Sequence, residues 1–245
     1  HAVKAVELGA DMITIQGGEG GGHTGGVPTT ILLPQVLAAV KVPVIAAGGY
    51  STGRGLAAAL AAGAAGIAMG TRFLMTTDSP TPPATLDRYV KVDDPQKVRV
   101  TLAVDGMRHR MIENPFINKL EGASPMGRLL IALKSAWHWK QQTDMSLGHM
   151  LGVFRQALKE DPGAVSQTVM SANQPVLLQR SMVDGFPDEG ILPSGQVAAA
   201  IGKLESCEDV IHGIAAEAET CLAALYARLD DGRGTEPCKE TAAVA

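Results

Sequence analysis

Residues 12–26 read Met12-Ile-Thr-Ile-Gln-Gly-Gly-Glu-Gly-Gly-Gly-His-Thr-Gly-Gly26, a short β-branched run that leads into a glycine-rich loop. The loop holds seven glycines and a single histidine, His23. Glycine loses more backbone entropy on folding than any other residue, so such a cluster is costly unless the backbone needs positive φ or a close approach. We therefore expect the loop to bind a flat or anionic ligand, with His23 facing its reactive part. The alternative is a flexible surface loop.

The composition limits the classes of protein to consider. The 245 residues suffice for one large domain, or for one domain and a smaller one. A net charge of −4 argues against general nucleic-acid binding. No apolar run reaches the roughly 18 residues that span a bilayer, so no membrane partner is expected. Three cysteines without metal-ligand spacing indicate reduced thiols, a cytoplasmic location and no metal site: Cys207, Cys221 and Cys238.

The chain opens without a methionine, in what reads as an amphipathic helix over residues 1–9 with Gly9 as its C-cap. A chain that begins inside a helix resembles a fragment. We therefore expect N-terminal sequence to be missing.

Strand and helix patterns alternate over residues 11–73. Three apolar runs predict strands that each end in glycine: 11–16, 43–47 and 66–69. Helical spacing between them predicts helices over 31–40 and 53–62. Ser51 or Thr52 can cap the second helix, which ends at Gly63. Such alternation favours a parallel sheet, in either a doubly wound fold or a (β/α)₈ barrel.

In both folds, ligands bind at the carboxyl ends of the strands. Gly48-Gly49 and Gly70-Thr71 follow two of these ends, where backbone N–H groups could hold a phosphate. The alternative for each pair is a tight turn between a strand and a helix.

The pattern changes at the proline-rich stretch 78–83. Alternation over 98–104, then Asp105-Gly106, predicts an antiparallel hairpin. Arg108, His109 and Arg110 follow it, and could meet an anionic substrate or form a solvated strand end. We expect four parts. Residues 1–80 form part of a barrel, and residues 81–190 form a mainly helical lid or substrate domain. Residues 191–229 are C-terminal helices that return to the barrel, and residues 230–245 are a disordered tail.

Three motifs in this order resemble the nitronate monooxygenase family: Gln16-Gly-Gly-Glu-Gly-Gly-Gly-His-Thr-Gly25, Pro43-Val-Ile-Ala-Ala-Gly-Gly49 and Met69-Gly-Thr-Arg-Phe73. The family includes NAD(P)H-dependent flavin reductases. The resemblance implies an FMN-binding (β/α)₈ TIM barrel with a mainly helical domain over its mouth. The three strands are then the sixth, seventh and eighth, which again implies an N-terminally truncated chain.

The resemblance also implies roles for residues. Gln16, Gly21 and Gly22 border the flavin, and His23 is the catalytic histidine. An imidazole titrates near neutrality and can take a carbon-bound proton, while the flavin transfers electrons. The FMN phosphate is held by residues after the second and third strands: Gly48, Gly49, Met69, Gly70 and Thr71.

Within the family, segments 18–25, 104–110 and 194–196 look closest to a steroid-degradation branch. Its members resemble NADH-dependent reductases of a ring-derived CoA thioester, which would give Arg108 and Arg110 a substrate to contact. The resemblance otherwise implies oxidation of alkyl nitronates with O₂, or NAD(P)H-dependent flavin reduction. NADH or NADPH is thus a candidate electron donor, and the oligomeric state is left open.

Two other readings stand beside this one. A phosphate-binding barrel of the IMP dehydrogenase type has similar glycine pairs, but it needs a nucleophilic cysteine where this chain has His23. An inactive barrel fragment would keep the phosphate half-site and leave open sheet edges, which predicts aggregation.

Overall fold

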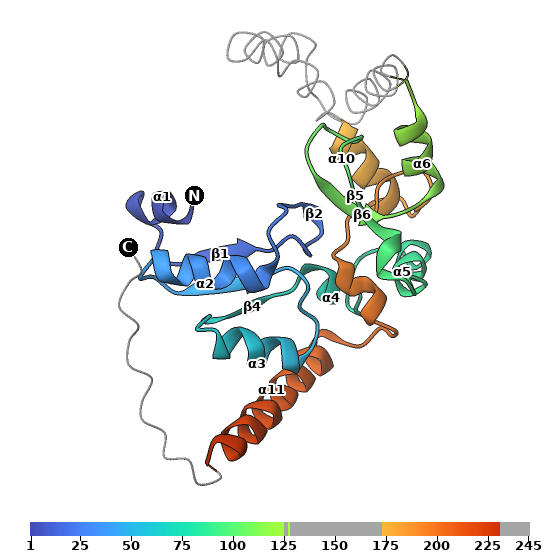
Figure 1. Ribbon diagram of the computed structural model, residues 1–245. Helices are drawn as coiled ribbons and strands as arrows, with labels where there is room; N and C mark the ends of the chain where they lie inside the picture. The colour runs from blue at the N-terminus through green and yellow to red at the C-terminus, as the bar shows by residue number, and fades with distance from the viewer. Residues whose placement is uncertain (125–126, 128–172, 231–245) are drawn as a thin grey trace. The chain divides into compact units, whose positions relative to one another are not determined.

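The computed structural model describes residues 1–124, 127 and 173–230 (Figure 1). Contacts divide the chain into two compact units. Unit 1 comprises His1–Gly20, Gly25–Asp78 and the chain from Lys203 onward, and unit 2 comprises Gly21–Thr24 and Ser79–Gly202. Each unit is described by itself.

Unit 1 is built on a three-stranded parallel sheet in the order β1-β3-β4. The strands confirm the three that the apolar runs predict: β1 (Ile13–Gln16), β3 (Val44–Ala47) and β4 (Gly66–Ala68). The described helices of this unit are α1 (Ala2–Glu7), α2 (Thr29–Ala39), α3 (Gly53–Ala61), α4 (Gly70–Leu74) and α11 (Cys207–Asp230). Strand and helix alternate from β1 to α4, apart from the two-residue β2 described below, so the βα reading of the sequence is confirmed.

Local sequence signals set the ends of these elements. Thr52 caps α3, because its side chain accepts a hydrogen bond from the N–H of Gly55 at 3.2 Å. Gly63 follows the helix with a φ of +100°, a conformation that favours glycine. The core of the unit lies between the sheet and its helices, and consists of Ile13, Ile15, Leu33, Val40, Val44, Ala46, Ala59 and Ala64.

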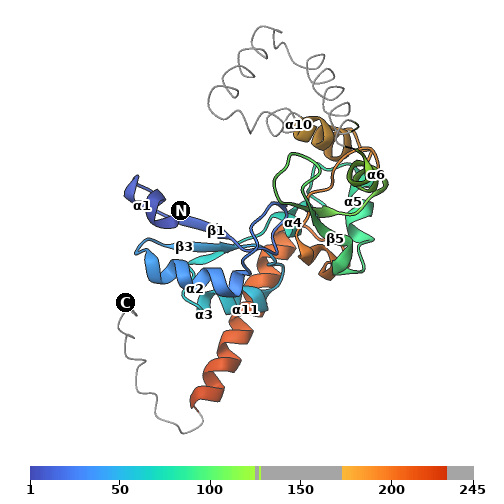
Figure 2. The same cartoon turned by 45° about the horizontal axis from the view of Figure 1, so that its top comes forward.

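Helices α3 and α11 lie side by side in unit 1 (Figures 1 and 2). The backbones are so close that a Cβ on Gly53 would come within 2.4 Å of the carbonyl oxygen of Ile214. The N–H of Gly53 donates to the carboxylate of Glu217 at 2.6 Å. Helix α11 can therefore pack this closely against α3 because α3 begins with a glycine.

A second contact joins the segment before α11 to the end of α4. The buried Arg72 donates to the carboxylate of Glu205 at 3.0 Å, and Thr76 forms an isolated parallel β-bridge with the same residue. The N–H of Cys207 donates to Asp78 at 2.5 Å. These contacts attach the C-terminal segment to unit 1.

Unit 2 contains an antiparallel sheet in the order β2-β6-β5. Its strands are β2 (Gly22–His23), β5 (Val98–Thr101) and β6 (His109–Ile112). The hairpin at Asp105-Gly106 is confirmed, and Gly106 has a φ of +83°. The sequence predicted a loop over residues 17–26, whereas Gly22 and His23 pair with Arg110 and His109. The two-residue strand escaped prediction because its pairing partner lies far along the chain.

The other described elements of unit 2 are α5 (Pro83–Val90), a 3₁₀ turn (Pro95–Lys97), α6 (Pro115–Gly122), α10 (Asn173–Leu178), a π-helical turn (Gln179–Val183) and a second 3₁₀ turn (Gln196–Ala200). Residues 191–202 belong to this unit by contacts, whereas the sequence grouped them with the C-terminal helices. A cluster of buried side chains forms its core: Ala103, Val104, Met111, Ile117, Leu120, Leu177 and Ile191. Residues 125–126 and 128–172 of the expected helical domain, and residues 231–245 of the expected tail with Cys238, lie outside the described residues.

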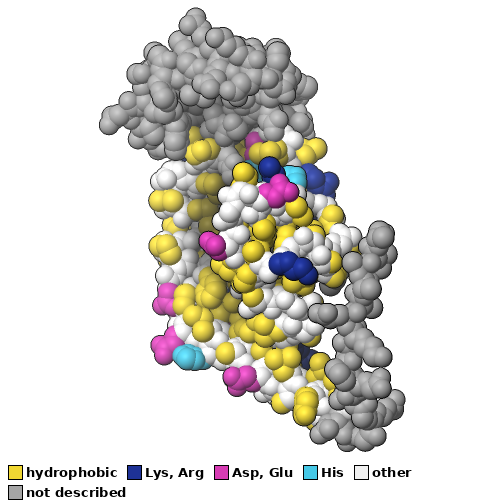
Figure 3. All heavy atoms as spheres, turned by 90° about the vertical axis from the view of Figure 1, so that its left-hand side faces the viewer, with side chains coloured by type: hydrophobic (Ala, Val, Ile, Leu, Met, Phe, Trp, Pro, Cys, Tyr) yellow, Lys and Arg dark blue, Asp and Glu magenta, His cyan; other side chains and the backbone are white. Residues whose placement is uncertain are grey.

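The surface carries numerous apolar side chains, as Figure 3 shows for one face. In unit 1 the exposed large hydrophobic side chains include Leu8, Met12, Ile31 and Leu60. Within the described residues, β1 and β4 each have one partner strand. Among those residues, no helix is long and apolar enough to cross a bilayer.

Candidate active site

The predicted cofactor residues of unit 1 lie together at the carboxyl ends of its strands. Gln16 ends β1, Gly48-Gly49 follow β3, and Met69 follows β4. The register pairs Gln16 with Ala47, and Ala47 with Ala68. The sheet therefore brings the three glycine-bearing ends to one edge, as the strand pattern predicts.

The Gly48-Gly49 pair needs glycine for its backbone conformation. Gly48 has a φ of +98° and Gly49 a φ of +82°. A Cβ at Gly48 would lie 3.0 Å from the carbonyl oxygen of Gly17, so the turn also passes close to the glycine loop.

Gly70 differs from this pair. It is the first residue of α4, and a Cβ placed on it would meet nothing within 4 Å. The first N–H groups of a helix have no partner inside the helix. At Gly70 there is therefore open space next to the backbone N–H groups that begin α4, at the edge where the strands end. Met69 and Thr71 flank Gly70 in the sequence.

The first part of the glycine loop is held by Glu19, a residue that the sequence did not single out. Its carboxylate accepts from the N–H of Thr29 at 3.0 and 3.1 Å and from the Thr29 hydroxyl at 2.9 Å. A carboxylate at the N-terminus of a helix, here α2, is favourable. Burial, and then the charge of Glu19, raise the pKa of Tyr50, so this phenol stays neutral.

His23 lies in unit 2, where it meets two residues of the β5–β6 hairpin. Its Nε2 is 2.6 Å from Oδ2 of Asp105. Its ring stacks on that of His109, with the centroids 4.3 Å apart and the planes inclined by 12°. The side chain of His23 is 39% exposed, whereas that of Asp105 is fully buried. The side chain of His23 is therefore partly exposed to solvent, while Asp105 and His109 contact it from within the unit.

Gly21 and Gly22 lead into His23 in the same unit. A Cβ on Gly21 would come within 2.4 Å of the Ser194 backbone, and Gly22 has a φ of +71°. Both positions therefore need glycine for reasons internal to unit 2. Their predicted role beside a flavin stays a prediction.

His109 is the second histidine of the group and is buried. Burial lowers its pKa, and the neighbouring His23 lowers it further, while Asp105 acts in the opposite direction. Its Nδ1 has no hydrogen-bond partner in the described structure. His109 is therefore uncharged at pH 7, and its ring packs face to face against that of His23.

The two predicted substrate arginines have different surroundings. The guanidinium of Arg110 donates to the carbonyl oxygen of Val98 at 3.1 Å, a contact that supports the hairpin. Arg108 is exposed, and its carbonyl oxygen accepts from the N–H of Thr24. Arg108 is thus the better placed of the two for contact with a dissolved anion.

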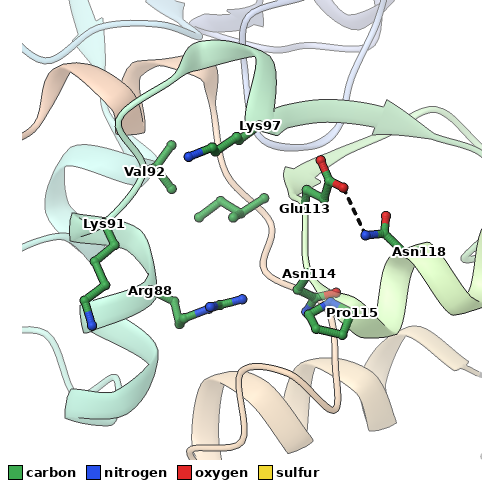
Figure 4. Close-up of a pocket in the computed structure, with 9 residues that line it drawn as sticks. Arg88, Lys91, Val92, Lys97, Glu113, Asn114, Pro115 and Asn118 are labelled. Atoms are coloured by element: carbon green, nitrogen blue, oxygen red, sulfur yellow. Dashed lines mark hydrogen bonds between the residues drawn. The ribbon is translucent and has the colours of Figure 1, made fainter.

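Unit 2 also has a cavity of about 410 Å³ next to α5 and α6 (Figure 4). Three basic side chains line it, but each is paired with a carboxylate: Arg88 with Asp188, Lys91 with Asp87 and Lys97 with Asp93. None of the predicted site residues lines this cavity. Its charges are already compensated, so we assign it no ligand.

A family model described as nitronate monooxygenase matches residues 1–217. The chain belongs to the nitronate monooxygenase family. The resemblance of the three glycine motifs is thereby confirmed, and the family is one of enzymes that catalyse oxidation and reduction.

Two curated relatives of this family member share one name, "(3aS,4S,5R,7aS)-5-hydroxy-7a-methyl-1-oxo-octahydro-1H-indene-4-carboxyl-CoA dehydrogenase". The protein from Rhodococcus jostii is 44% identical over 93% of this chain, and that from Mycobacterium tuberculosis is 46% identical over 91%. The chain spans 64% and 63% of their lengths, respectively.

A solved structure, that of FabK from Thermotoga maritima, is similar to this nitronate monooxygenase family member with a TM-score of 0.67 and 28% identity. The match covers 93% of this chain and 60% of that one. Family and neighbour together show an α/β fold of the TIM-barrel type, which decides between the barrel and the doubly wound sheet.

Sequence reasoning missed the roles of Asp105, His109 and Glu19. It used Asp105 only as a turn residue and grouped His109 with the neighbouring arginines. Alternation along β6 was the available signal for His109, because it predicts that residues 109 and 111 face the same, buried side. No local pattern links Asp105 to His23, which lies 82 residues away.

Proposed function

We propose that this chain is part of an FMN-dependent oxidoreductase that acts on a CoA thioester with a fused-ring acyl group. One observation carries the proposal, namely 44–46% identity over more than nine-tenths of the chain to two proteins named as dehydrogenases of such a thioester. Both names describe a hydroxylated octahydroindene-carboxyl-CoA, so the substrate class is a CoA thioester on a fused ring that carries a hydroxyl group.

The edge of the sheet in unit 1 fits the phosphate of FMN. Gly48, Gly49 and Gly70 place no Cβ at this edge, and the space beside Gly70 is open, which supports the approach of an anion to the backbone there. Gln16, Met69 and Thr71 are proposed to complete the cofactor contacts. The flavin would supply a two-electron acceptor.

His23 supplies the acid–base function. Both names place a hydroxyl group on ring carbon 5, next to the carbon that bears the thioester. In the proposed dehydrogenation, the hydroxyl loses its proton and carbon 5 loses a hydride, which the flavin would accept. The imidazole of His23 takes the proton as a general base. Arg108 is proposed to contact the anionic part of the substrate.

The decisive experiment is an anaerobic spectrum of the purified protein after removal of free flavin. Bleaching of flavin bands by a hydroxy ring-carboxyl-CoA thioester supports the proposal, as does reoxidation of the reduced flavin by the corresponding keto thioester. Bands that respond to neither form of the thioester would contradict it. A protein without flavin after reconstitution with FMN would favour an inactive barrel fragment.

Oxidation of alkyl nitronates is the second candidate function, favoured by the family model over residues 1–217. The same spectra separate the two, because here a nitronate bleaches the flavin and the thioester does not. Addition of NADH and of NADPH in separate cuvettes tests the third variant of the family resemblance, a flavin reductase.

A further inference from the structure

We propose that Asp105 is a positioning residue that fixes the tautomer and the ring orientation of His23, so that Nδ1 is the atom that accepts the substrate proton. The inference rests on the proposed role of His23 as the acid–base group. The hydrogen bond and the ring stack that support it are features of unit 2 alone.

The hydrogen bonds of Asp105 determine which ring nitrogen of His23 carries the hydrogen. A carboxylate can only accept, and Oδ1 of Asp105 already accepts the N–H of Met107 at 2.9 Å. Oδ2 lies 2.6 Å from Nε2 of His23, so Nε2 carries the hydrogen and donates it. In the neutral imidazole, Nδ1 then holds the lone pair.

Burial makes this hydrogen bond selective. Asp105 is fully buried, and a buried carboxylate is stable only when its oxygens are hydrogen-bonded. The tautomer with hydrogen on Nδ1 would place the lone pair of Nε2 against a carboxylate oxygen, a repulsive contact. The carboxylate therefore selects one tautomer of His23.

The stack on His109 fixes the plane of the ring. Pairing of His23 with His109 in the β2–β6 register sets the two side chains next to each other. The described charged or titrating groups that face His109 are His23 and Asp105. Because His109 is neutral, the stack supports His23 without repelling the imidazolium that forms when His23 takes a proton.

A metal ion is the competing interpretation, since the ligand atoms of His23, Asp105 and His109 all lie within 4.8 Å of one another. Imidazole lone pairs lie in the plane of the ring, and a zinc ion sits about 2.0–2.1 Å from each nitrogen. Planes inclined by 12° with centroids 4.3 Å apart do not meet within that distance. The stacked arrangement therefore suits a hydrogen-bonded base and not a shared ion.

Asp105→Asn is the sharpest test because the new side chain has the same shape. Its oxygen can keep the hydrogen bond from Met107, which turns the amide NH₂ toward Nε2 of His23. Nε2 must then accept, and the hydrogen moves to Nδ1. We expect kcat to fall by about 10²–10⁴-fold while KM and flavin content stay close to the unchanged protein.

The matched control is Asp93→Asn, which removes an exposed ion pair with Lys97 in the same unit. It should leave kcat unchanged. An Asp105→Asn protein that folds and turns over at the unchanged rate would overturn the proposal.

A measurement without turnover separates this inference from the proposed function. Long-range ¹H–¹⁵N spectra of histidine-labelled protein at neutral pH should show His23 with hydrogen on Nε2, and with hydrogen on Nδ1 in Asp105→Asn. If no substrate reacts but these tautomers are found, the proposed function fails and the positioning role stands. Hydrogen on Nδ1 in the unchanged protein, or stoichiometric Zn²⁺ binding that shifts both His23 and His109, would overturn the inference.

Discussion

His23 acquires its chemical environment from two residues of a distant hairpin. Asp105 binds one ring nitrogen at 2.6 Å, and His109 covers one ring face with a centroid distance of 4.3 Å. The side chain nevertheless stays 39% exposed, so it can meet a ligand from the open side. This combination is typical of a general base, which must be held in place and still be accessible.

Replacement of His23 tests this role directly. His23→Ala or His23→Asn should lower turnover by about 10²–10⁴-fold, the usual contribution of a general acid–base group. Flavin content should change little, because the proposed phosphate contacts come from other residues. Steady-state kinetics with a flavin assay on the same samples gives both values, and unchanged turnover would remove His23 from the mechanism.

Gly70 offers a cleaner test of the phosphate site than Gly49. Any substitution of Gly49 strains a backbone with a φ of +82°, so loss of flavin there has two explanations. At Gly70 a side chain enters open space, and Gly70→Leu should leave the fold intact but abolish FMN retention. Gly213→Leu, in open space on α11, is the control that should keep its flavin. Full flavin occupancy in Gly70→Leu would refute the placement of the phosphate.

At the scale of elements, the contact of α3 with α11 depends on one missing side chain. Gly53 begins α3, and the backbone of α11 lies where its Cβ would be. The same glycine donates its N–H to Glu217 of α11. Helix propensity alone would favour alanine over glycine at this position, whereas the close approach of the two helices requires glycine.

Gly53→Ala should destabilise the protein by about 1–3 kcal/mol or more, since the new methyl group overlaps the backbone of α11. Propensity alone predicts the opposite sign. Gly213→Ala in α11 meets no atom within 4 Å and should stabilise the protein by up to about 1 kcal/mol. Denaturant unfolding of both variants gives the two values, and a Gly53→Ala protein that is as stable as the unchanged protein, or more stable, would show that α3 and α11 are not closely packed.

The stability of the molecule should depend on pH through His109. Its pKa is lowered from the ordinary 6.5 in the folded protein, chiefly by burial. Below about pH 6.5 the unfolded chain therefore binds a proton that the folded chain does not, and the free energy of unfolding falls as pH falls. One such group contributes at most about 1.4 kcal/mol per pH unit.

His109→Phe keeps an aromatic ring against His23 and removes the titrating nitrogens. Between pH 7.5 and 5.5 it should lose less stability than the unchanged protein, by up to about 1.4 kcal/mol. Urea unfolding at both pH values measures the difference. Parallel pH dependences would mean that His109 is not the group that links protonation to unfolding.

The sequence by itself determined the elements of unit 1 and the hairpin of unit 2. Apolar runs that end in glycine gave β1, β3 and β4, and Thr52 and Gly63 marked the ends of α3, because caps and positive φ values are local properties. The ordered glycine motifs also identified the family. The folding of the glycine loop into β2 could not be read from the sequence, since pairing with β6 joins residues more than 80 positions apart.

Only the tertiary structure decided which side chains meet His23. Asp105 is a turn residue by every local rule, and its carboxylate becomes a partner of His23 only when β2 pairs with β6 and burial removes competing water. The contact of Gly53 with α11 is of the same kind, because it joins segments that are adjacent in space and distant in the chain. Local rules determine what each segment forms, whereas long-range packing determines which segments share a site.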